Sequence, residues 1–288
     1  MFVLLVGYFS KIGIKTEKYV VSAFNVLALF LIFNLTMGVC FPTELTVNDF
    51  LTPRMGAWFL LSLFFWKITL MYIKPFWINY NGLVVCIVIS IIAYFCPLGE
   101  WFAFTRTVDM FPFLFLGLIL KGTNFFQRLR SIPKIYPSLI LIFALISIYF
   151  FHPFQNHIYQ EYRGGAFLPL VERLLSSLAA VVMGLSVYCV LPHNNRFMAK
   201  MGQRTLFIYI YHLILLGLLV AVVKRYDLPM SWPYVALYII SIISICCILS
   251  NVKFLNDLTK PKYLSSTARC IYGFISSLAL KRRQKVQD

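Results

Sequence analysis

The sequence predicts an all-α fold, a polytopic membrane helical bundle of about eight transmembrane helices, and three observations lead to it. The 288 residues are 60% hydrophobic and 12% charged, whereas soluble domains carry about 25% charged residues. Eight apolar stretches follow one another, and about 20 apolar residues match the ~30 Å hydrocarbon core of a bilayer. Lys and Arg gather in alternate gaps between these stretches, as cytoplasmic loops of membrane proteins do.

Each expected helix is an apolar stretch bounded by polar or charged gaps, because a charged side chain at the bilayer centre is costly. In order along the chain, the expected helices cover residues 19–40, 56–73, 82–95, 107–120, 135–151, 168–191, 205–223 and 232–252.

The charges in the gaps predict the orientation. Basic residues precede the first stretch, occupy every second gap after it and follow the last stretch. They are Lys11, Lys15, Lys18, Lys74, Lys121, Arg128, Arg130, Lys134, Arg196, Lys200, Arg204 and the Lys and Arg residues of the tail 253–288. The other gaps hold fewer basic residues, and acidic ones partly offset these. Because cytoplasmic loops are rich in Lys and Arg, the C-terminus is expected in the cytoplasm.

The net charge of +16 does not indicate a nucleic-acid-binding protein, because membrane topology accounts for the basic residues in the short loops and the tail. Such residues beside apolar spans meet anionic lipid instead. The Cys residues show no C-x-x-C spacing, and most fall within or at the ends of apolar stretches. Neither a disulfide framework nor a metal site is expected.

The two ends of the chain differ. Residues 1–9 are apolar but too short to span, and they resemble the last two turns of a helix whose beginning is absent. Four apolar residues of the tail recur at helical spacing ahead of a Lys-Arg-Arg run, namely Ile271, Phe274, Ile275 and Leu278. This spacing predicts a segment lying on the inner leaflet, and a frayed basic tail is the alternative. We therefore expect a membrane domain, residues 1–252, and a cytoplasmic tail, residues 253–288.

Polar side chains inside the expected spans are candidate functional groups, because an ionisable group at membrane depth is costly. On the stretch 205–223, Thr205, Tyr209 and His212 fall on one face at 100° per residue. A neutral imidazole there can accept or donate a proton, or hold a substrate hydroxyl. His212 is therefore the candidate catalytic residue. The alternative is a His that hydrogen-bonds a neighbouring helix.

Tyr209 and five charged residues in or beside the spans are candidates for substrate binding. Glu172 and Arg173 point about 100° apart, so each needs its own partner, in an aqueous pocket or on a neighbouring helix. Arg106 and Asp109 are three residues apart and can pair on one face. Lys67 lies about two turns before a cytoplasmic gap. It either snorkels to the interface or meets an anionic donor that enters from the cytoplasm.

Two further patterns carry little functional information. Asn34-Leu35-Thr36 fits an N-glycosylation sequon but lies within an expected span, and His152 and His157 in an outer loop have no other metal ligands near them. No Ser-His-Asp order, phosphate loop or dinucleotide fingerprint occurs.

Four segments, taken in order, resemble integral membrane acyltransferases of the acyltransferase-3 family, in particular the branch related to fucose 4-O-acetylases. They are MFVLLVGYFS at 1–10, AWFLLSLFFW at 57–66, FTRTVDMFPFLFLG at 104–117 and MGQRTLFIYIYH at 201–212. The resemblance covers nearly the whole chain. It carries over to Trp58, Arg106 and His212, as supporting residues, because these positions match the family's motifs.

The resemblance implies a bacterial inner-membrane protein that moves an acetyl or acyl group from acetyl-CoA or another acyl-CoA to a hydroxyl of a cell-surface glycan or glycolipid precursor. It implies no bound cofactor; the acyl-CoA is the donor substrate. The family has ten spans, and its catalytic His lies in the first, which the chain is expected to lack. Activity would then need His212 as a substitute, or a partner chain that carries the absent helix.

Two alternatives to an active enzyme remain open at the level of the sequence. One is a truncated, catalytically inactive relative that shares the fold without the chemistry. The other is a transporter or flippase of a lipid-linked glycan, which the polar stripe at Glu172 and Arg173 suits. The absence of an internal repeat argues against this second alternative.

Overall fold

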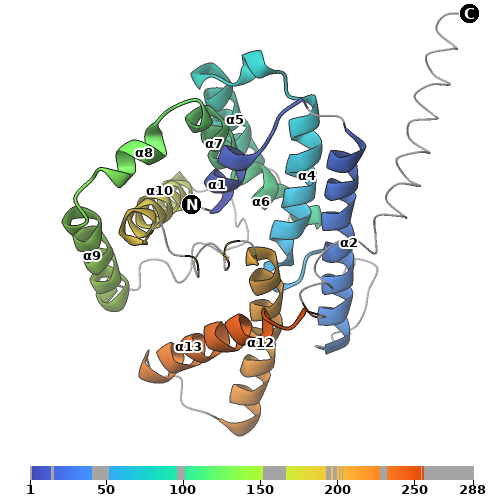
Figure 1. Ribbon diagram of the computed structural model, residues 1–288, viewed down its shortest axis with the longest axis vertical. Helices are drawn as coiled ribbons and strands as arrows, with labels where there is room; N and C mark the ends of the chain where they lie inside the picture. Colours follow the sequence, from blue (N-terminus) through green and yellow to red (C-terminus); the bar gives the residue numbers. More distant parts are fainter. Residues whose placement is uncertain are drawn as a thin grey trace, which may run out of the picture. The chain divides into compact units, whose positions relative to one another are not determined.

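The computed structural model describes residues 2–13, 16–40, 52–95, 101–151, 167–192, 196, 200, 202, 204–227, 232–253 and 255. Within these residues the secondary structure is helical and no strand occurs, so the all-α prediction is confirmed for the described part of the chain (Figure 1). The outer loop around His152 and His157 and the amphipathic tail segment lie outside the described residues.

The helices follow the predicted apolar stretches. They are α1 (Phe2–Phe9), α2 (Glu17–Cys40), η1 (Met55–Ala57), α4 (Trp58–Tyr72), η2 (Pro75–Trp77), α5 (Tyr80–Tyr94), η3 (Trp101–Ala103), α6 (Phe104–Asp109), α7 (Phe111–Lys121), α8 (Phe125–Arg130), α9 (Ile135–Phe151), α10 (Phe167–Val190), α12 (Thr205–Tyr226) and α13 (Trp232–Leu249).

The stretch 107–120 is two helices rather than the predicted single one. α6 begins at Phe104 and ends at Asp109, and α7 begins at Phe111 with Pro112 in its first turn. Proline has no backbone N–H and suits the first turn of a helix better than its interior. The carbonyl of Thr107, just before the break, accepts a hydrogen bond from Trp66 Nε1 at 3.0 Å. The short helix α8 was also not predicted.

Among the described residues, two helices have a clear membrane-spanning length. Residues Glu17–Gly38 and Thr205–Val223 are long and apolar enough to cross a bilayer by length and composition. The apolar stretches of the other helices, as far as their side chains are described, are shorter, for example Trp58–Tyr72, Tyr80–Ala93 and Leu174–Val190. The described part of the chain is therefore all-helical, and the number of membrane crossings stays a prediction.

The chain divides into two compact units, and the division falls inside α4. The first unit holds Met1–Ile14 and Phe65–Pro192. In this unit α1 packs closely on α7, because glycines stand at the contact: a Cβ on Gly7 would overlap the carbonyl of Leu114, and one on Gly117 would overlap that of Leu4. Small residues allow two helix backbones to approach in this way.

The second unit holds Lys15–Phe64 and His193–Asp288. The buried side chain of Asn34 in α2 receives a hydrogen bond from the backbone N–H of Arg54 at 2.9 Å and donates one to the Thr52 carbonyl at 3.4 Å. At the end of α13, Arg204 donates hydrogen bonds to Ser250 at 3.2 Å and to Asn251 at 2.7 Å. These polar contacts fix segments that the apolar pattern alone does not position.

Candidate functional site

The second unit brings Trp58, Tyr209 and His212, three of the residues singled out in the sequence, into one row of rings. Trp58 and Phe59, at the start of α4, pack edge to face with ring centroids 6.0 Å apart. The Phe59 ring lies 5.2 Å from that of Tyr209, and the Tyr209 ring lies 5.6 Å from His212. We call Trp58, Phe59, Tyr209 and His212 the aromatic row.

The imidazole of His212 is held by its own helix. Its Nδ1 lies 2.9 Å from the carbonyl oxygen of Ile208, one turn earlier in α12. A carbonyl oxygen only accepts hydrogen bonds, so Nδ1 carries the proton. In the neutral ring Nε2 is then the acceptor. Within the described residues no hydrogen bond is made to Nε2, so this half-buried histidine presents a basic nitrogen.

Tyr209 fixes the row against the segment that leads into α4. Its hydroxyl donates a hydrogen bond to the carbonyl oxygen of Gly56 in η1. A Cβ on Gly56 would lie 2.6 Å from a methyl group of Leu213 and 3.2 Å from the Tyr209 hydroxyl, so only glycine fits this contact without a shift. Sequence reasoning missed Gly56 and Phe59. The only available signal was their position beside Trp58.

Thr205 shares the predicted face of α12 but plays a local role. Its hydroxyl donates to the Gly202 carbonyl at 2.7 Å, at the start of the helix. The aromatic row thus places one basic nitrogen, Nε2 of His212, among aromatic rings. No acidic side chain is among the described contacts of the imidazole. Such a group can take a proton from a hydroxyl and return it.

No family model, curated protein or solved structure matches this chain.

The other candidate residues belong to the first unit. Asp109, the last residue of α6, accepts a hydrogen bond from the hydroxyl of Ser90 in α5 at 3.2 Å. Arg106 is half-buried one turn before it. Lys67 is half-buried in the middle of α4. The contact between Ser90 and Asp109 was not predicted, because two separate helices contribute to it.

Glu172 and Arg173 fall in α10, where the helix is described and their side chains are not. Their predicted role as a polar stripe thus lies outside the described residues. Within the described residues no group of three His, Cys, Asp or Glu side chains is placed to hold a metal ion.

Proposed function

We propose that this protein is a membrane O-acyltransferase that moves an acetyl group from acetyl-CoA to a hydroxyl of a cell-surface glycan or its precursor. The observation that carries the proposal is the hydrogen bond from His212 Nδ1 to Ile208, which leaves Nε2 as a proton acceptor. The order of the four acyltransferase-like segments, which includes this histidine and Trp58, supports the same reading.

In the proposed reaction Nε2 of His212 removes the proton from the acceptor hydroxyl as its oxygen attacks the thioester carbonyl of acetyl-CoA. The tetrahedral intermediate collapses, the carbon–sulfur bond breaks, and the imidazolium returns the proton to the CoA thiolate. General base catalysis of this kind contributes about 10²–10⁴-fold to a rate. The carbonyl of Ile208 and the ring of Tyr209 hold the imidazole in position for it.

The remaining candidates take supporting roles in this proposal. Trp58, in the same unit as the histidine, is the proposed apolar wall beside it. Lys67, Arg106, Glu172 and Arg173 belong to the other unit, and their proposed role in substrate binding rests on the sequence alone.

The proposed setting is a bundle of eight spans in a bacterial inner membrane. Large apolar side chains that face outward on α9 support it, because soluble proteins rarely expose contiguous apolar patches. Phe143 is 72% exposed and Leu145 is 64% exposed, and exposed isoleucines and leucines lie on the neighbouring turns. In a bilayer such a helix surface meets lipid tails.

Replacement of His212 tests the proposed chemistry. His212→Gln keeps a polar side chain of similar size but removes the base, so O-acetylation of envelope glycan should fall by about 10²-fold or more. The measurement is acetate released by mild alkali from the glycan of cells that produce the chain. Tyr211→Phe is the matched control, because Tyr211 stacks on Phe207 at 4.2 Å and lies outside the aromatic row.

The expected result is near-normal acetylation with Tyr211→Phe and near-background acetylation with His212→Gln. Full acetylation with His212→Gln would remove this residue from the mechanism. No acetylation above background with the unchanged chain would favour an inactive relative and overturn the proposed function.

A further inference from the structure

Basic side chains gather around α8, which connects α7 to α9 in the first unit (Figure 1). Lys121 is the last residue of α7, Arg128 and Arg130 belong to α8, and Lys134 stands just before α9. All four side chains are exposed. We call these four residues the basic cluster. Because basic gaps face the cytoplasm, the cluster is expected at the inner leaflet.

An aromatic contact fixes α8 to the rest of the unit. The ring of Phe126 packs edge to face against Tyr8 in α1 and against Tyr188 in α10, with ring centroids 4.6 Å and 5.1 Å apart. Phe126 itself is buried. The position of α8, and of the arginines that it carries, is therefore set by two other helices.

The arrangement of side chains around α8 is that of a helix lying in the plane of a membrane surface. Phe125, Phe126 and Leu129 form its apolar face, and none of them is exposed. At 100° per residue, Arg128 and Arg130 fall about 100° to either side of the centre of this face. Helices at the boundary between headgroups and acyl chains carry an apolar face and basic residues in this way.

Hydrogen bonds orient two members of the basic cluster and leave most of their donors available. Nε of Arg130 donates to the Tyr188 hydroxyl at 2.9 Å, and Nζ of Lys121 donates to the Ser10 carbonyl at 2.6 Å. A guanidinium has five N–H groups and an ammonium has three. Each side chain therefore keeps donors for an anion, and the guanidinium can hold two phosphate oxygens at once.

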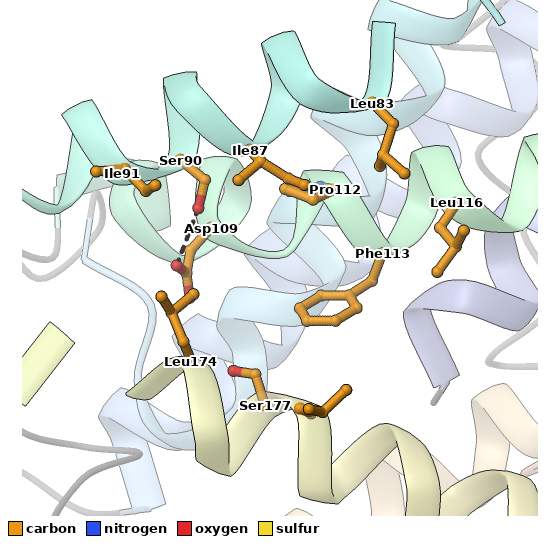
Figure 2. Close-up of a pocket in the computed structure, with 11 residues that line it drawn as sticks. Leu83, Ile87, Ser90, Ile91, Asp109, Pro112, Phe113, Leu116, Leu174 and Ser177 are labelled. Atoms are coloured by element: carbon orange, nitrogen blue, oxygen red, sulfur yellow. Dashed lines mark hydrogen bonds between the residues drawn. The ribbon is translucent and has the colours of Figure 1, made fainter. Parts of the chain in front are cut away.

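Acidic residues do not offset this charge nearby. Those of the first unit are Glu100, Asp109, Glu161 and Glu172. Asp109, which Figure 2 shows bonded to α5, precedes α7, so the length of that helix, about 16 Å, separates it from Lys121. Glu172 stands near the start of α10, whose other end packs on α8. Glu100 and Glu161 lie outside the described residues.

Exposed aromatic rings at the turn from α4 to α5 indicate that this end of the unit lies among lipid headgroups. Phe76 and Trp77 are 64% and 52% exposed, and aromatic side chains are enriched at membrane–water interfaces. The segment after α1 joins this turn to the basic cluster. Gly13 donates to the Leu70 carbonyl near the end of α4 at 3.0 Å, three residues after the carbonyl that Lys121 bonds.

We propose that the basic cluster binds the headgroup of an anionic phospholipid of the inner leaflet. The lipid phosphate meets the cluster, and the acyl chains lie along α9, where Leu139 and Phe143 are 54% and 72% exposed. A zwitterionic lipid carries a cation beside its phosphate and so gains less from unpaired basic residues. A soluble phosphate lacks the chains. The inference rests on the proposed membrane setting and not on the proposed acyl transfer.

The test measures lipid binding to the full chain in detergent by native mass spectrometry. Dioleoyl phosphatidylglycerol should bind more tightly than dioleoyl phosphatidylcholine. Arg128→Gln together with Arg130→Gln should raise the Kd for phosphatidylglycerol about thirtyfold, or about fivefold for each arginine. Arg225→Gln is the matched control, because Arg225 is also exposed on a helix and belongs to the other unit. Its Kd should equal that of the parent chain, and phosphatidylcholine binding should be the same in all variants.

Three results would each overturn the assignment. The first is an equal Kd for phosphatidylglycerol in the double variant and the Arg225→Gln control. The second is displacement of the lipid by glycerol 3-phosphate at the same concentration, which would make the cluster a site for soluble phosphates. The third is displacement by acetyl-CoA at that concentration, which would assign the cluster to the donor substrate. Lipid binding is measured without acetyl transfer, so the lipid site and the proposed reaction can fail separately.

Discussion

Asn34 illustrates how a single polar residue organises an apolar region. Its side chain bonds the backbone of two residues, Thr52 and Arg54, that lie just before η1 and α4. Asn34 is 5% exposed within α2. In the apparent sequon its side chain therefore has a structural role, because it links α2 to the segment before η1. The two residues bonded by Asn34 lie close in sequence to Gly56, whose carbonyl oxygen accepts the hydrogen bond from the Tyr209 hydroxyl.

Replacement of Asn34 should therefore reduce stability. Asn34→Leu keeps a branched side chain but removes the amide, so the Arg54 N–H loses its acceptor, and an unsatisfied buried group costs about 1–3 kcal/mol. Thermal unfolding in detergent measures the change. Thr36→Val is the control, because among the described residues the Thr36 hydroxyl donates only within its own helix, to the Ile32 carbonyl at 2.8 Å. An equal melting temperature for Asn34→Leu and the parent chain would refute a stabilising role for the Asn34 hydrogen bonds.

At the level of the elements, the contact between α1 and α7 depends on two glycines that face opposite backbones. Gly117→Ala should destabilise the first unit, because overpacking costs about 1–3 kcal/mol. This cost outweighs the higher helix propensity of alanine, which favours the helix by about 1 kcal/mol relative to glycine. Gly122→Ala is the control, because the nearest atom to its added Cβ is 3.8 Å away.

The measurement is again thermal unfolding of the full chain in detergent. A lower melting temperature for Gly117→Ala than for Gly122→Ala is expected. The reverse order would mean that the packing of α1 on α7 does not contribute to the stability of the first unit.

The helices themselves were predictable, because long apolar runs between charged gaps define them without any knowledge of packing. The break between α6 and α7 at Met110 was harder to predict. Pro112 was visible in the sequence, but a proline can either kink a helix or begin a new one. The hydrogen bond from Trp66 to the Thr107 carbonyl, just before the break, is a tertiary contact that the sequence does not reveal. The helix α8 has only six residues and three polar side chains, so its pattern resembles a loop.

The candidate site was predictable only in part. Tyr209 and His212 share one helix, so helical periodicity placed them together. The resemblance named Trp58 as a supporting residue without placing it beside Tyr209, and in the structure Phe59 links the two helices. The contact of Tyr209 with Gly56 could not be predicted, because 153 residues separate the partners and no periodic pattern reports such a distance in sequence. The same limit applies to Ser90 and Asp109, which meet across two helices.

For the whole molecule, the distribution of Lys and Arg predicts which gaps face the cytoplasm. The gap that holds α8 is basic: Arg130 there donates to the Tyr188 hydroxyl at 2.9 Å, and Lys121 donates to the Ser10 carbonyl at 2.6 Å. Basic side chains at the cytoplasmic surface also meet anionic lipid, which contributes about 1 kcal/mol per residue. The gap after α12 is expected on the opposite side of the membrane.

Labelling of introduced thiols tests this arrangement. Gln127→Cys places a thiol on the exposed side of α8, and Tyr226→Cys places one at a residue that is 67% exposed at the end of α12. A membrane-impermeant maleimide should label Tyr226→Cys in intact cells, and Gln127→Cys only after the membrane is opened, because the eight-span arrangement predicts an odd number of crossings between the two positions. The parent chain, with its seven Cys, sets the background. Labelling of Gln127→Cys in intact cells would reverse the orientation, and labelling of both variants would contradict the eight-span arrangement.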